Sequence, residues 1–195
     1  MTFYDKVSHI SEEFWLTPLA QLFSKMDAAY DAVADVYGFN CRGCVDNCCY
    51  TRFHHHTLLE YMYLKKGLEI LEPSIQMQVF EQAGDVVEAT RAAEEKGQTP
   101  RVMCPLNHEG LCLIYAYRPM ICRLHGMAHE LRKPGQNPLR SEGCGLFTEL
   151  TGTMDYIPFD RTPFYMEMAR LERNLREASG VADKLRMTIA EMIRL

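Results

Sequence analysis

The sequence predicts a mainly α-helical protein in which a helical frame surrounds an irregular, cysteine-rich centre. Apolar residues recur at spacings of three or four near both ends of the chain, which is typical of amphipathic helices. The stretch 97–160 is instead interrupted repeatedly by proline and glycine, which favours loops and short elements. All eight cysteines lie between positions 41 and 144. We therefore expect one domain over 1–195 with a metal-binding core at its centre.

The N-terminal helix is predicted over 11–37. Ser11 is a suitable N-cap, and the acidic residues that follow it suit the positive end of a helix dipole. Gly38 is a natural stop. The periodic apolar positions of this helix are Leu19, Leu22, Met26, Tyr30, Val33 and Tyr37.

Two further helices are predicted between the N-terminal helix and residue 97. Thr57 and Glu60 have the spacing of a capping box, so a helix should run from Leu58 to Leu71, with Gly67 as its weak point. A third helix is predicted over 74–96, where alanine, glutamate, glutamine and valine dominate.

The C-terminal helices are predicted over 162–194. Thr162-Pro163 is a favourable start, because proline fits the first turn of a helix. Gly180 should break this segment, and a last helix is expected from Val181 to Arg194.

Composition excludes several classes of protein. Hydrophobic residues make up 47% of the chain and charged residues 24%, an ordinary globular balance. The net charge of −5 argues against a nucleic-acid partner. No apolar run approaches the roughly 18 residues of a membrane span, and residues 1–9 lack the pattern of a signal peptide. A cytoplasmic location follows as the expectation, and there thiols stay reduced or bind metal.

The cysteines fall into two groups whose spacing favours metal binding. A pair separated by two residues can turn back onto one cation, as in zinc and iron–sulfur sites. Four disulfides are the main alternative, and unrelated buried thiols are another, but a chain of this length needs no disulfides to stabilise its core. The predicted ligands are Cys41, Cys44, Cys48 and Cys49 in the first group, and Cys104, Cys112, Cys122 and Cys144 in the second.

Basic residues accompany the second cysteine group. Between 112 and 140 there are five arginines and lysines but one acid, Glu130. Four thiolates on a divalent ion leave a negative site, which nearby guanidinium groups would stabilise. Arg118 and Arg123 flank Cys122 and are predicted to lie just outside the ligands.

The cysteine pattern resembles the YkgJ family, also known by its CxxCxxxCC motif. The resemblance rests on Cys41-x2-Cys44-x3-Cys48-Cys49, on Cys104-Pro105-Leu106, and on the string Gly110-Leu111-Cys112-Leu113-Ile114-Tyr115-Ala116-Tyr117-Arg118-Pro119-Met120-Ile121-Cys122-Arg123. It covers about residues 38–147 and implies a cysteine-cluster domain that chelates zinc or iron. Cys144 stands where the last cysteine of such a domain would be expected.

A related group of flagellin lysine-N-methylases is associated with an iron–sulfur cluster. The resemblance therefore keeps two functions open. One is a metal-binding protein, including an interaction module in which zinc only fixes the shape. The other is an iron–sulfur-dependent enzyme such as a protein lysine methylase-like modifier or a redox protein. The eight thiolates could form two sites of four, or one cluster with the remaining thiols free or paired with histidine. No protein partner, substrate or catalytic residue is indicated.

Histidines near the cysteines are weaker candidates. The triplet His54-His55-His56 follows the first group, but consecutive side chains point in different directions, so an exposed or structural role is favoured. His125 is the best candidate for a mixed cysteine–histidine site.

Overall fold

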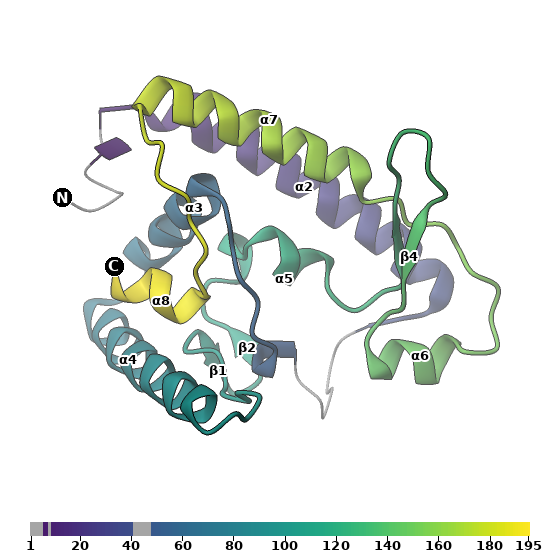
Figure 1. The fold of residues 1–195 in the computed structure, drawn as a ribbon, viewed down its shortest axis with the longest axis horizontal. Helices are drawn as coiled ribbons and strands as arrows, with labels where there is room; N and C mark the ends of the chain where they lie inside the picture. Colours follow the sequence, from purple (N-terminus) through teal and green to yellow (C-terminus); the bar gives the residue numbers. More distant parts are fainter. Residues whose placement is uncertain (1–5, 8, 41–47) are drawn as a thin grey trace. The chain divides into compact units, whose positions relative to one another are not determined.

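The computed structural model describes residues 6–7, 9–40 and 48–195, and these are mainly helical (Figure 1). The chain divides into two compact units, each assembled from segments that are distant in the sequence. Unit 1 comprises Met1–Ile10, Asn47–Pro119 and Leu175–Leu195, and unit 2 comprises Ser11–Asp46 and Met120–Asn174. Residues 1–5, Cys41 and Cys44, for which the sequence makes predictions, lie outside the described residues.

Unit 1 contains two longer helices, a short C-terminal helix and a small hairpin. Helix α3 spans Leu58–Glu69, α4 spans Pro73–Glu95 and α8 spans Ile189–Arg194. Strands β1 (Asn107–His108) and β2 (Leu111–Cys112) pair antiparallel. Two short 3₁₀ helices are η1 (Cys48–Tyr50), which carries two cysteines, and η2 (Tyr115–Tyr117), which follows β2. The core of unit 1 is built from apolar side chains that include Leu58, Leu59, Tyr61, Leu64, Val79, Leu106, Ile114 and Ile193.

Local sequence explains how α3 is placed. The side chain of Thr57 accepts the backbone N–H of Glu60 at 3.1 Å, so the predicted N-cap is confirmed. Gly67 is not a weak point but a point of close approach, since a Cβ there would lie 2.6 Å from Cβ of Tyr117. The ring of Tyr63 packs at 4.9 Å from that of Tyr117, which fixes η2 against α3.

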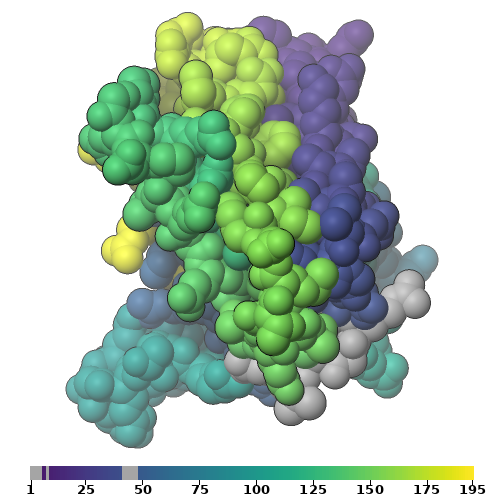
Figure 2. All heavy atoms as spheres, turned by 90° about the vertical axis from the view of Figure 1, so that its right-hand side faces the viewer, coloured from purple at the N-terminus to yellow at the C-terminus, as the bar shows by residue number. Residues whose placement is uncertain are grey.

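Unit 2 is built on a long helix. Helix α2 spans Glu12–Tyr37, with Ser11 as N-cap and Gly38 in the left-handed conformation, so the predicted N-terminal helix is confirmed. The shorter elements are α5 (Met120–Leu124), the hairpin of β3 (His129–Leu131) and β4 (Leu139–Ser141), and α6 (Gly145–Thr151). Helix α7 spans Thr162–Ser179, and within unit 2 it runs beside α2 (Figure 1, Figure 2).

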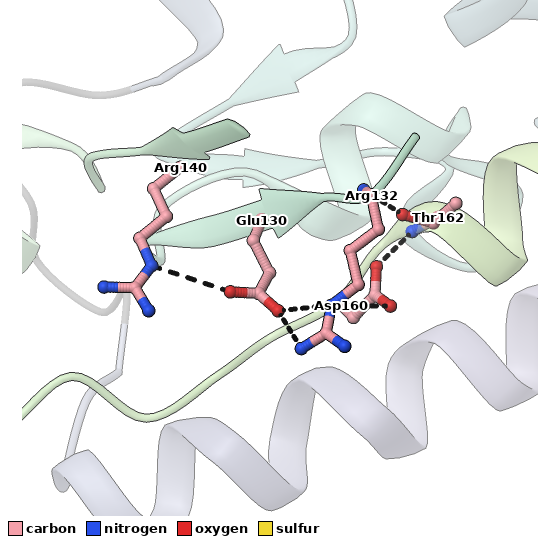
Figure 3. A network of polar contacts seen from close by, with 5 residues as sticks. All are labelled: Glu130, Arg132, Arg140, Asp160 and Thr162. Atoms are coloured by element: carbon pink, nitrogen blue, oxygen red, sulfur yellow. Dashed lines mark hydrogen bonds and ion pairs between the residues drawn. The ribbon is translucent and has the colours of Figure 1, made fainter. Parts of the chain in front are cut away.

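A polar network anchors the β3–β4 hairpin of unit 2 (Figure 3). The side chain of Glu130 is 1% exposed, and it receives the guanidinium of Arg132 at 2.5 Å and lies 3.7 Å from that of Arg140. The backbone of Glu130 also pairs with the following segment, because its N–H donates to Phe159 and its carbonyl accepts from Arg161. The hairpin is therefore held both by backbone hydrogen bonds and by a buried carboxylate.

The last predicted helix is wrong over 181–188. These residues are not helical, and α8 begins only at Ile189, after the capping box of Thr188 and Glu191. Two contacts hold the preceding segment extended. The guanidinium of Arg176 donates to the carbonyls of Val181 and Asp183, and Met187 forms an antiparallel backbone bridge with His55.

Among the residues that the structure describes, no helix combines the length and the apolar character that crossing a membrane requires.

Candidate metal centre

Four of the predicted ligands gather in unit 1. Cys48 and Cys49 lie in η1, and the backbone N–H of Cys104 donates to the carbonyl of Cys49 at 2.9 Å. Cys104 is joined in turn to the hairpin, because its carbonyl accepts the N–H of Asn107 at 3.0 Å. Asn107 is paired with Cys112 across β1 and β2. We call Cys48, Cys49, Cys104 and Cys112 the unit 1 cysteine group.

A tight turn brings the two hairpin strands of this group together. Glu109 and Gly110 both have positive φ, 50° and 84°, as a two-residue hairpin loop of type I′ requires. The Asn107 side-chain Oδ1 accepts the N–H of Gly110 at 3.1 Å and closes the turn. The chain therefore reverses sharply enough to bring Cys112 back to the segment that carries Cys104.

The thiols of the unit 1 cysteine group affect one another electrostatically. The Cys48 thiol donates a hydrogen bond to the sulfur of Cys49, and this is the main reason why the pKa of Cys49 is lowered to about 6. Burial raises the pKa of Cys104 to about 12 and also raises that of Cys112. The charge of Cys49 contributes to both increases.

Backbone amides near two of these sulfurs act against the effect of burial. The amide of Leu106 lowers the pKa of Cys104, and that of Ile114 lowers the pKa of Cys112, so both favour the thiolate. In each case the amide lies two residues after the cysteine.

Two side chains beside the unit 1 cysteine group also favour a thiolate. The charge of Arg118 lowers the pKa values of Cys49 and Cys112, and its guanidinium is held by the carbonyl and the ring of Tyr115. The amide of Asn107 lowers the pKa of Cys49 as well. Asn107 is missing from the sequence-based prediction, although its spacing to Gly110 is a recognisable turn pattern.

The other predicted ligands belong to unit 2 or lie outside the described residues. Cys122 is half-buried in α5, and Cys144 is the N-cap of α6, where its sulfur accepts the N–H of Phe147 at 3.5 Å. The backbone N–H of Cys144 donates to the carbonyl of Gly126 at 2.7 Å, which places it near the end of α5. Cys41 and Cys44 are not described.

Arg123 is placed differently from Arg118. It is buried in unit 2, where its guanidinium binds Asp27 of α2 at 2.5 Å and lies 4.4 Å from the centre of the Phe23 ring. These contacts join α5 to α2. A role of Arg123 beside a metal ligand stays a prediction.

His125 and His129 are neighbours in unit 2. Burial lowers the pKa of each imidazole, and the charge of Arg161 lowers it further. Both side chains are therefore favoured in the neutral form, the form in which histidine binds metal. Nδ1 of His129 is buried and has no hydrogen-bond partner.

No disulfide joins any two of the cysteines that the structure describes, which are Cys48, Cys49, Cys104, Cys112, Cys122 and Cys144. In residues 6–7, 9–40 and 48–195, no group of three or more histidine, cysteine, aspartate or glutamate side chains is arranged as a metal site. The unit 1 cysteine group thus brings suitable donors together without ligand geometry.

No protein-family model matches the chain, and neither a curated protein nor a solved structure matches it.

Proposed function

We propose that this protein binds zinc or iron through its cysteines and that one site is formed within unit 1 by Cys48, Cys49, Cys104 and Cys112. The observation that carries the proposal is the convergence of η1 with the β1–β2 hairpin. The hydrogen bond from Cys104 to Cys49 and the electrostatic coupling of Cys49, Cys104 and Cys112 support it.

The chemistry of the donor set selects the class of metal. Sulfur ligands favour zinc or iron–sulfur clusters over magnesium or calcium, which prefer oxygen. Four thiolates complete a tetrahedral zinc site or hold an iron–sulfur cluster. When bound, the metal would supply a cross-link between segments that are far apart in the sequence, and this cross-link would add to folding stability.

The surroundings of the group would reduce the cost of holding several negative charges together. The amides of Leu106 and Ile114 each favour the thiolate form of one cysteine, and the charge of Arg118 favours it at two of them. Hydrogen bonds and opposite charges both favour the ionised form of a thiol. The same contacts would orient the sulfur ligands once they converge on a metal.

The remaining cysteines would complete a second site if all eight are ligands. Four cysteines remain once the unit 1 cysteine group is assigned: Cys122 and Cys144, which lie in unit 2, and Cys41 and Cys44. With the eight cysteines divided in this way, the adjacent Cys48 and Cys49 are ligands of the same metal centre.

Purification of the full chain under anaerobic conditions, followed by elemental analysis and visible absorption, tests the proposal. We expect stoichiometric zinc in a colourless protein, or iron with sulfide in a brown one. Cys104→Ser and Cys112→Ser should each lose the metal of unit 1, whereas the exposed neighbour His108→Gln should keep it. Protein free of both metals, or full metal content in both cysteine variants, would refute the unit 1 site.

The metal found also separates the two functional classes. Zinc would favour a structural centre. An iron–sulfur cluster would retain the alternative of a cluster-dependent enzyme, such as a lysine methylase-like modifier, because a cluster can leave one iron open to a substrate.

A further inference from the structure

The histidine triplet lies on a segment whose backbone is held extended. The N–H of His55 donates to the carbonyl of Met187 at 2.7 Å, and the N–H of Met187 donates back to His55 at 3.0 Å. This reciprocal pair is an antiparallel bridge, so the side chains around it should alternate between the two faces.

The exposure of the three histidines follows this alternation. The side chain of His55 is buried, whereas His54 is half-exposed and His56 is exposed. Residues two apart on an extended chain are separated by about 6.6 Å and lie on the same face. His54 and His56 therefore share the outer face, although neighbouring residues in a triplet point in different directions.

We propose that His54 and His56 form a surface site for a divalent transition-metal ion, separate from the cysteines. Imidazole nitrogen is a good ligand for zinc, nickel and copper. Two imidazoles fixed on one face can chelate a single ion, with water completing its coordination. The site is independent of the proposed cysteine centre because it uses neither its ligands nor their neighbours.

Burial is the main reason why the pKa of His54 is lowered, so its imidazole is favoured in the neutral form that binds metal. The charges of Arg186, Arg52 and His56 lower the pKa further, and these positive charges also act against a bound cation. Arg52 is paired with Glu94, so part of its charge is balanced. Glu191 acts in the opposite sense on His54 and brings a negative charge to the same surface.

Glu191 is held in place near the pair. One of its carboxylate oxygens accepts both the N–H and the hydroxyl of Thr188, at 2.7 Å and 2.9 Å. The capping box thus holds a carboxylate whose charge partly offsets that of Arg186 at His54. A bound cation would be favoured by this carboxylate even without direct coordination.

Retention on immobilised nickel tests the pair, with the untagged full chain first loaded with zinc and then freed of weakly held surface zinc by gel filtration. The zinc that remains keeps the thiols occupied, and elemental analysis before loading and after elution verifies that it stays bound. Wild type should be retained until imidazole is added. His54→Gln and His56→Gln should each elute at an imidazole concentration at least tenfold lower than that needed for wild type. The double variant should elute at no lower a concentration than either single variant, because chelation needs both rings.

His108→Gln is the matched control, since His108 is also an exposed histidine of unit 1. It should behave as wild type, and circular dichroism should verify that all variants are folded. Retention that survives the double variant, or that falls with only one of the two single variants, would overturn the proposal. Equal loss in His108→Gln would overturn it as well.

Discussion

The backbone N–H of Cys104 donates to the carbonyl of Cys49, with 2.9 Å between nitrogen and oxygen. This bond connects the first cysteine cluster of the sequence to the second, and it does so within one compact unit. A metal held by both clusters would stabilise the same junction that the backbone already forms.

Removal of metal from the full chain should loosen the junction of η1 and the β1–β2 hairpin while leaving most of the helix content intact. If free metal is present at about a thousand times its dissociation constant, binding adds about 4 kcal/mol to the free energy of unfolding. Amide hydrogen exchange should therefore accelerate at Cys104 and Leu113, and Cys112→Ser should have the same effect. Amides inside α4 are the internal control, and an unchanged melting temperature after complete removal of metal would contradict the prediction.

Metal affinity should rise with pH between about 6 and 8. Cys104, with a pKa of about 12, and Cys112, whose pKa is also raised, must lose protons to bind, whereas Cys49, with a pKa of about 6, is already largely ionised at pH 7. Cys48, whose thiol donates to Cys49, must also lose its proton, so release of about three protons gives about a thousandfold change in affinity per pH unit. Calorimetry in buffers of different ionisation enthalpy measures this release directly, and a value below two would argue against ligation by Cys104 and Cys112.

The sequence predicts the helix ends better than it predicts the contacts between segments that are far apart in the chain. The cap at Thr57 and the stop at Gly38 are local features, and both are confirmed. By contrast, the segment 181–188 has helix-compatible residues but is held extended by Arg176 and by the bridge to His55. These partners are distant in sequence or lie outside the segment itself, so periodicity could not identify them.

The candidate site shows the same division between local and distant information. Spacing alone groups Cys48 and Cys49 with the cysteines before them, and Cys104 and Cys112 with those after them. The fold instead places these four in one unit and Cys122 and Cys144 in the other. Closing the long loop between Cys49 and Cys104 depends on tertiary packing, for which the sequence carries no short-range signal.

Arg118→Met should raise the pKa of Cys49, because it removes a positive charge that favours the thiolate. In metal-free protein near pH 6.5, alkylation of Cys49 should slow by about two- to fivefold, a modest effect since solvent screens the charge. Tandem mass spectrometry, which fragments the peptide between the adjacent Cys48 and Cys49, assigns the alkylation to Cys49. Arg101→Met is the matched control, because Arg101 stacks 5.1 Å from the Tyr50 ring in the same unit and is not among the groups that shift Cys49. Equal slowing in both variants would argue against a specific role of Arg118.

Glu130→Gln should destabilise unit 2 by about 1–3 kcal/mol, the usual cost of weakening buried hydrogen bonds to a charged group. The carboxylate is 1% exposed and accepts Arg132 at 2.5 Å, so a neutral amide loses the charge that holds both arginines of the hairpin (Figure 3). Urea unfolding should detect the loss, and hydrogen exchange should assign it to β3 and β4. Glu149→Gln changes an exposed carboxylate of α6 in the same unit and should shift stability by less than about 0.5 kcal/mol. Glu130→Gln should leave the metal content of the protein unaltered, because the described contacts of Glu130 involve arginines and backbone and no cysteine. If the two variants unfold alike, the buried network does not hold the hairpin.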